Sequence, residues 1–146
     1  PSEMLVAQGG CMASMGVAVS SPGVATAISL ACNARYKTSS SLVCSVLLPY
    51  IMEDAARAKV DKIVTIGKML GVSGAGLNSS EIARAAIDDI RRRLALAGLP
   101  TRLKDLELTI DQLVPVAEDA AALDLMNYIP RAMSSDELFD LVKQAY

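Results

Sequence analysis

Residues 20–49 read SSPGVATAISLACNARYKTSSSLVCSVLLP, and this segment decides the fold that the sequence predicts. Small and apolar residues fill positions 22–34, a polar stretch occupies positions 35–41, and a second apolar run begins at Leu42. Proline suits the first turn of a helix, and serine suits the residue that caps one. We therefore expect two apolar helices joined by a polar turn, with Pro49 kinking or dividing the second helix.

The segment that precedes this pair predicts another helix, at residues 2–19, whose glycines and alanines would let a neighbour approach closely. No charged residue occurs at positions 4–34, but glycine and serine dilute this run and Pro22 interrupts it. A membrane-spanning helix needs about 20 strongly apolar residues. We therefore interpret the run as two buried helices and expect no membrane association.

Apolar periodicity and capping residues predict the remaining helices. We expect helices at residues 60–70 and 78–97, each ended by the glycine that follows, and a short helical or turn segment at 101–108. Further helices begin at Thr109, where Pro115 would disturb the second turn, and at Ser134. Three pairs have the spacing of a capping box: Asn78–Glu81, Thr109–Gln112 and Ser134–Glu137.

The composition favours one helical domain over the whole chain, residues 1–146. Apolar residues make up 52% of the sequence and aromatic residues only 3%, and no alternating strand pattern occurs. A net charge of −2 gives no reason to expect nucleic acid as a partner. The three cysteines form no CxxC pair, which predicts buried reduced thiols and a reducing, cytoplasmic location.

Two local patterns are weak signals for phosphate binding. Residues 72–77, VSGAGL, hold a GxG fragment without a preceding strand or a third glycine, so an inter-helix loop is the better interpretation. Arg91, Arg92 and Arg93 fall in the last turns of a helix, where cations complement the helix dipole. A solvated helix end explains them better than a nucleic-acid contact.

Three segments in order resemble the C-terminal helical domain of the iron-containing (group III) alcohol dehydrogenases, the α part of the dehydroquinate synthase-like fold. The first is the opening stretch, which ends in Leu47-Leu48-Pro49 and continues as YIME. The second is LAGLPTRLKDLEL at residues 96–108. The third is the tail, with Ala-Glu-Asp at 117–119, NYIPR at 127–131 and SSDELFDLVKQAY at 134–146. The resemblance covers nearly the whole chain and implies an all-α fold.

The resemblance also implies a chemistry, which the residues of this chain do not supply. The family's enzymes bind NAD(P) in an N-terminal α/β domain and hold a divalent metal, iron or zinc, with three histidines and an aspartate. Alignment on Leu47-Leu48-Pro49 places two ligand histidines at Thr26 and Ser40, and a third family histidine, near the reacting centre, at Leu30. The other ligands and the nucleotide-binding domain correspond to sequence before Pro1. The chain contains no histidine, so we expect no catalytic residue, no metal ligand and no cofactor in it.

Three functions remain open from the sequence. The chain is either a non-catalytic helical domain on this scaffold or part of an NAD(P)- and metal-dependent alcohol dehydrogenase, completed by a separate nucleotide-binding polypeptide or by an N-terminal region. A helical adaptor unrelated to dehydrogenases is a third alternative. Because family helices would precede Pro1, we also expect an exposed apolar face at residues 4–19 and a homo-oligomer formed through it.

Overall fold

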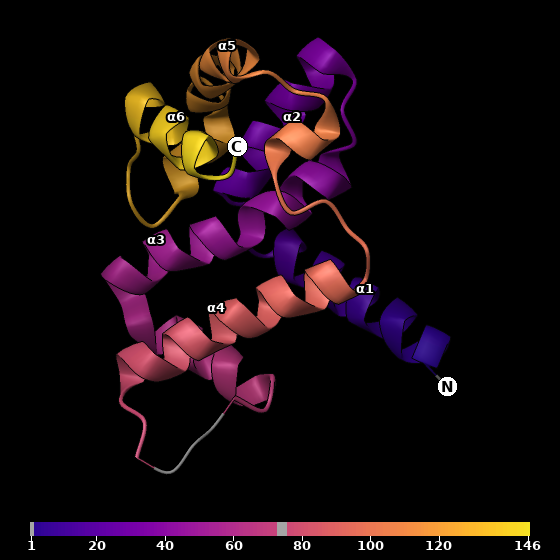
Figure 1. Ribbon diagram of the computed structural model, residues 1–146, viewed down its shortest axis with the longest axis vertical. Helices are drawn as coiled ribbons and strands as arrows, with labels where there is room; N and C mark the ends of the chain where they lie inside the picture. The colour runs from indigo at the N-terminus through magenta and orange to yellow at the C-terminus, as the bar shows by residue number, and fades with distance from the viewer. Residues whose placement is uncertain (1, 73–75) are drawn as a thin grey trace.

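The computed structural model describes residues 2–72 and 76–146, so Ser73, Gly74 and Ala75 of the predicted GxG loop lie outside the described residues. Within these ranges the chain is helical and contains no strand (Figure 1), which confirms the all-α prediction. The helices are α1 Ser2–Ala18, α2 Val24–Tyr36, α3 Ser40–Met69, α4 Ser79–Leu96, η1 Leu103–Leu106, α5 Ile110–Ala121, η2 Asp124–Tyr128 and α6 Ser135–Gln144.

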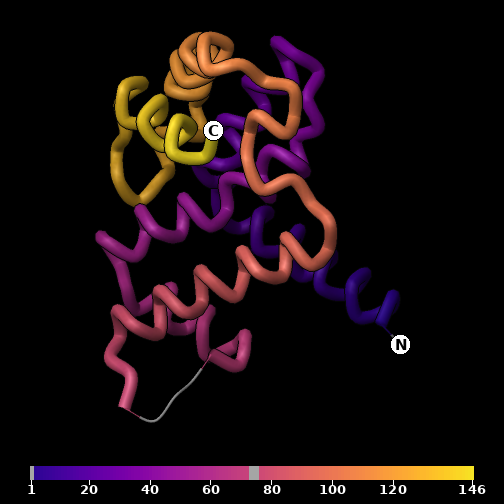
Figure 2. The backbone as a smooth tube through the Cα atoms, viewed as in Figure 1, coloured from indigo at the N-terminus to yellow at the C-terminus, as the bar shows by residue number. Residues whose placement is uncertain are grey.

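Two apolar clusters hold the helices together. The larger cluster joins α2, the first part of α3, α5 and α6, which gather at one end of the molecule (Figure 2). Its fully buried side chains include Ile28, Leu47, Leu113 and Leu138. The smaller cluster lies between α3 and α4 and contains Met52, Ile63, Val64, Ala83 and Ile87.

The two-helix prediction for residues 20–49 is confirmed, with α2 and α3 joined by a short polar turn. Lys37 ends α2 in the left-handed conformation with φ 57°, and its N–H donates to the carbonyl oxygen of Asn33 over 3.0 Å. The Asn33 side chain donates to the carbonyl oxygen of Thr38 over 3.0 Å. These contacts supply donors to the carbonyl oxygens of Asn33 and Thr38. The last carbonyl groups of a helix need such donors because no N–H group of a following turn reaches them.

The predicted kink at Pro49 is wrong, because α3 continues through this buried residue. The break falls instead at Lys59, whose backbone angles of φ −145° and ψ 67° are not helical. It turns the last part of α3 back along α4, so that Ile63 and Val64 bury against Ala83 and Ile87. No glycine or proline marks residues 50–66 in the sequence, so tertiary packing sets the position of the break.

The interpretation of residues 4–34 as two buried helices is correct for α2 and wrong for α1. No residue of α1 is buried, and the helix projects from the rest of the molecule (Figure 1). Among the described residues, no atom of another element lies within 4 Å of where a side chain at Gly9, Gly10 or Gly16 would begin, so none of the described helices packs closely against these glycines. Among the described residues, no helix is long and apolar enough to cross a membrane.

The prediction of three buried thiols holds only for Cys32. Burial raises the pKa of the Cys32 thiol to about 11, because the interior disfavours the charged thiolate. Cys11 is exposed on α1 and Cys44 is half-buried on α3. Their apolar sequence neighbours suggested burial, but α1, which carries Cys11, packs against none of the helices within residues 2–72 and 76–146.

The predicted helix ends agree with the structure at the capping boxes and at the glycines that end helices. Asn78 and Glu81 form a complete capping box, as do Ser134 and Glu137. At α5 the Gln112 side chain accepts from the Thr109 N–H over 2.9 Å, and the helix continues through Pro115. Gly71, with φ +82°, and Gly98, with φ +69°, follow α3 and α4, in the conformation that glycine adopts most readily.

The close approach of α3 and α4 at Gly67 is a packing constraint that can be tested. A Cβ atom at this position would lie 3.1 Å from Ala86 Cβ and from Ile82 Cγ2. We expect Gly67→Leu to lower the free energy of unfolding by about 1–3 kcal/mol through overpacking, measured by urea denaturation. Thr65→Leu, on the exposed side of the same helix, should change it by less than about 0.5 kcal/mol. Equal effects of the two variants would contradict the packing.

Candidate functional site

Of the three positions that the sequence assigns to family histidines, two lie one turn apart on α2 and the third begins α3. Thr26 occupies the first turn of α2, where its N–H donates to the carbonyl oxygen of Gly23 over 3.0 Å, and Leu30 follows one turn later. Ser40 is the first residue of α3, and its Oγ donates to the carbonyl oxygen of Ser29 over 3.4 Å. The contact brings Ser40 beside the residue of α2 that precedes Leu30 and lies three residues after Thr26.

The side chains at this corner are at least partly exposed to solvent, and none of them carries a charge at neutral pH. Thr26 and Ser40 are half-buried, and Leu30 is 46% exposed. The neighbouring Ser29 is buried, and its hydroxyl donates to the carbonyl oxygen of Thr26 over 2.9 Å. That contact satisfies the one buried polar side chain beside the corner without any metal or ligand.

The donor set at the corner does not fit iron or zinc. Both ions bind imidazole, thiolate or carboxylate groups, whereas Thr26 and Ser40 offer neutral hydroxyls and Leu30 offers only methyl groups. Within residues 2–72 and 76–146, no group of three or more His, Cys, Asp or Glu side chains is placed to hold a metal ion. We therefore derive no metal-dependent step at this corner.

An ion pair ties the far end of α2 to α5. Arg35 Nε and a terminal guanidinium nitrogen donate to the two carboxylate oxygens of Asp119 over 2.5 and 2.9 Å. Hydrogen bonding from Arg35 holds the pKa of Asp119 below its usual value. The sequence placed Asp119 only within a family-like Ala-Glu-Asp segment, and its partner lies 84 residues away. A pairing between residues so far apart in the chain leaves no pattern in the local sequence by which it could be predicted.

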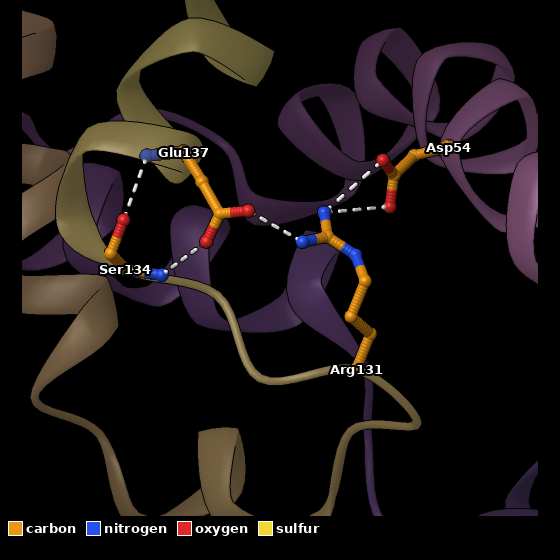
Figure 3. A network of polar contacts seen from close by, with 4 residues as sticks. All are labelled: Asp54, Arg131, Ser134 and Glu137. Atoms are coloured by element: carbon orange, nitrogen blue, oxygen red, sulfur yellow. Dashed lines mark hydrogen bonds and ion pairs between the residues drawn. The ribbon is translucent and has the colours of Figure 1, made fainter.

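A second polar network centres on Arg131 and joins α3 to the start of α6 (Figure 3). One terminal nitrogen of Arg131 donates to Asp54 on α3 over 3.2 and 3.3 Å, and the other donates to Glu137 over 2.6 Å. Glu137 also accepts from the Ser134 N–H over 2.9 Å, as part of the capping box. The Pro130-Arg131 segment is thus a structural clamp between two helices.

The arginines at the end of α4 are ion-paired within the chain. Arg92 and Arg93 both contact Asp89, and Arg91 pairs with Glu53 over 2.9 Å while stacking 5.3 Å above the centre of the Tyr50 ring. These contacts agree with the interpretation of a solvated helix end for Arg92 and Arg93, whose side chains are 62% and 56% exposed. Arg91 is less exposed because it lies against α3.

Two surface cavities lie away from the corner. A groove of about 590 Å³ runs between α3 and α4 and is lined by paired charges such as Glu53 and Arg91. A cleft of about 210 Å³ is lined mainly by apolar residues of α3 and of the loop before α6, including Ile51, Ile129 and Met133. Neither lining includes Thr26, Leu30 or Ser40.

Comparison with known proteins finds one family model and solved structures that match this architecture. The family model "Fe-containing alcohol dehydrogenase family, C-terminal" matches residues 2–146. A crystal structure of a 1,3-propanediol oxidoreductase superposes with a TM-score of 0.80 at 25% identity, over 85% of this chain and 32% of that one. An alcohol dehydrogenase from Oenococcus oeni gives a TM-score of 0.85 at 21% identity, over 92% and 35%. The chain thus spans about a third of the length of either structure. Among curated proteins, nothing matches.

The Arg131 network predicts a specific dependence of stability on pH. The hydrogen bond from the Ser134 backbone and the contact with Arg131 lower the pKa of Glu137 in the folded state. A carboxylate with a depressed pKa stabilises the fold above its unfolded pKa, near 4.3, and loses that contribution as the pH falls through the folded pKa. We expect Glu137→Gln to make the free energy of unfolding fall less steeply below about pH 4.3, measured by denaturation at each pH.

The matched control is Asp140→Asn, which removes an exposed carboxylate from the same helix and keeps the contact between Arg131 and Glu137. In this variant, the part of the pH dependence of the free energy of unfolding that comes from Glu137 should remain. An acid profile of Glu137→Gln that coincides with the unmodified protein would rule out the network as its source.

Proposed function

Because the chain belongs to the Fe-containing alcohol dehydrogenase family, as its C-terminal domain, we propose that it is a helical scaffold domain that does not catalyse metal-dependent alcohol oxidation by itself. One observation carries the proposal. The sequence alignment assigns the family's histidine positions to Thr26, Leu30 and Ser40, of which the first two lie one turn apart on α2, and the third, at the start of α3, contacts the Ser29 backbone. Hydride transfer in such a site depends on a metal ion that stabilises the developing alkoxide, and these side chains cannot hold one.

The surrounding contacts support a scaffold role, because the groups that maintain the fold are independent of a metal. The turn between α2 and α3 is fixed by backbone and amide hydrogen bonds, and α2 is held to α5 by Arg35 and Asp119. Residues next to the corner, such as Ile28 and Ala31, are buried in the larger apolar cluster. We therefore propose a domain that retains the apolar core of the family and has no side chains that bind its metal ion.

Direct titration tests the proposal. We expect the untagged protein to show no stoichiometric binding of Fe(II), Zn(II) or NADH at micromolar concentrations, because the corner offers no imidazole or carboxylate to a metal. Isothermal titration calorimetry, with Fe(II) under anaerobic conditions, measures this. One-to-one binding of either metal with micromolar affinity would overturn the proposal.

Restoring histidines tests whether the corner keeps a usable geometry. Residues four apart on a helix share a face, and two imidazoles at this spacing can hold one zinc ion. We expect Thr26→His/Leu30→His to bind Zn(II) at least roughly tenfold more tightly than the unmodified protein, because both positions are accessible on α2.

The matched control is Thr26→His/Ala34→His, which adds the same number of imidazoles to exposed or half-buried positions of α2. These positions lie about 12 Å apart along the helix axis, too far to share one ion. Equal zinc affinity for both double variants would show that the first pair gains nothing from its placement.

The alternative is that another polypeptide, or an N-terminal region, completes an active NAD(P)-dependent enzyme. It is supported by the lengths of the matched structures, of which this chain spans 32% and 35%. Alcohol-dependent reduction of NAD by this chain mixed with an α/β polypeptide that carries a glycine-rich turn, but by neither alone, would favour this alternative. A mixture that stays inactive favours the scaffold.

A cytoplasmic location is part of the same proposal. It rests on the three cysteines, which are all unpaired in the structure and would remain reduced in that compartment. Fractionation of the native host, followed by thiol labelling, would test the location.

A further inference from the structure

A third cavity lies where α3, the end of α4 and the loop before η1 meet. Its volume is about 410 Å³, within the range of clefts that hold small organic ligands. Among the described residues, its lining includes Arg91, Arg92 and Arg102 but no aspartate or glutamate. The linings of the other two cavities both include carboxylates. The third cavity, called the arginine cleft below, is therefore the one suited to an anion.

The carboxylates that pair with two of these arginines lie outside the lining of the arginine cleft. Arg91 contacts Glu53 over 2.9 Å and Asp88 over 3.5 Å. Arg92 contacts Asp89 through one terminal nitrogen. A guanidinium group carries five N–H donors, so both arginines keep donors that these partners do not use.

The third arginine, Arg102, is carried by a loop that backbone contacts hold in place. Asp105 Oδ2 accepts from the N–H groups of Thr101 and Arg102 over 3.3 and 3.1 Å. The next residue, Leu103, is fully buried, and its N–H donates to the carbonyl oxygen of Ala145 over 2.8 Å. The ion pairs formed within residues 2–72 and 76–146 do not include the Arg102 guanidinium, whose residue is exposed.

The rest of the lining of the arginine cleft suits an organic group. Val46 and Pro49 on α3 are buried, Leu94 on α4 is half-buried, and all three contribute apolar surface to the lining. Arg91 also lies 5.3 Å above the centre of the Tyr50 ring, a cation–π contact that restricts its position. An apolar surface beside fixed guanidinium groups favours a ligand with an anionic end and an apolar end.

We propose that the arginine cleft binds a small organic phosphate monoester. Near neutral pH such an ester carries a charge of about −1.5 to −2 and three acceptor oxygens, which match several guanidinium groups better than the two oxygens of a carboxylate. The phosphate contacts Arg92 and Arg102, and the organic group lies on the apolar residues of α3 and α4. This inference goes beyond the proposed scaffold function, because it involves no residue of the corner and no metal ion.

Isothermal titration calorimetry with phenyl phosphate, at about 50 mM salt to limit screening, tests the proposal. We expect one-to-one binding with a Kd of about 0.1–1 mM, because so small a ligand makes few contacts. Inorganic phosphate should bind at least about threefold more weakly, since it has no group to place on the apolar lining. Benzoate should also bind more weakly, because it carries a single charge. Absence of binding at about 10 mM phenyl phosphate, or equal affinities for phenyl phosphate and inorganic phosphate, would overturn the proposal.

Two arginine variants test where the ligand binds. Arg102→Gln removes a lining guanidinium and should raise the Kd for phenyl phosphate at least about fivefold. The matched control is Arg93→Gln, which removes the same charge from the neighbouring end of α4. Arg93 does not line the arginine cleft, and its 56% exposed side chain pairs with Asp89. We expect this variant to change the Kd by less than about twofold. Equal weakening by the two variants would indicate attraction to charge alone and would contradict the site.

The same variants distinguish a small ligand from nucleic acid. A single-stranded oligonucleotide without a terminal phosphate should bind more weakly than phenyl phosphate, because its phosphate groups are diesters with one charge each. An oligonucleotide that binds more tightly, and loses affinity in Arg102→Gln, would assign the arginine cleft to nucleic acid and overturn the proposal. Circular dichroism of each variant should match that of the unmodified protein, because both arginines are exposed.

Discussion

The helix α3 is the element on which the other helices depend, because it contributes to both apolar clusters. Its first part buries Val43, Val46 and Leu47 among α2, α5 and α6, and its last part buries Ile63 and Val64 against α4. A straight helix of 30 residues would extend for about 45 Å and could not serve both clusters. The non-helical conformation at Lys59 resolves this by reversing the chain, and Gly67 then permits close contact with α4.

Polar contacts fix the remaining helices relative to α3. Arg131 lies between Asp54 on α3 and Glu137 on α6, and Arg35 joins α2 to α5 through Asp119. Exposed ion pairs contribute little energy one by one, but these arginines each donate several hydrogen bonds in a defined direction. They set how the helices meet, whereas the apolar clusters supply most of the stability.

The corner between α2 and α3, where the sequence alignment predicts the family's histidine positions, is held by contacts within the chain. The corner is maintained by the buried faces of the two helices and by a hydroxyl contact between Ser40 and the Ser29 backbone. None of these interactions requires a metal. They belong to a fold that superposes on a 1,3-propanediol oxidoreductase and on an alcohol dehydrogenase with TM-scores of 0.80 and 0.85.

The sequence by itself determined the features that depend on neighbouring residues. Capping boxes, glycine helix ends and the polar turn after α2 involve groups within a few residues of one another, so Asn78, Ser134 and Gly98 could be interpreted correctly. The assignment of the family's histidine positions to Thr26, Leu30 and Ser40, by alignment on Leu47-Leu48-Pro49, stays a prediction.

Only the tertiary structure decided where α3 breaks and which arginines pair with which carboxylates, and it showed that every side of α1 is exposed, where the resemblance predicted one exposed face. Proline at position 49 removes one hydrogen bond, a local penalty that burial of the helix outweighs. The break at Lys59 is favoured by apolar contacts with a helix that begins 20 residues later. The exposure of α1 could not be inferred from its apolar sequence, because burial requires a partner surface, and α1 finds none among the other helices described for this chain.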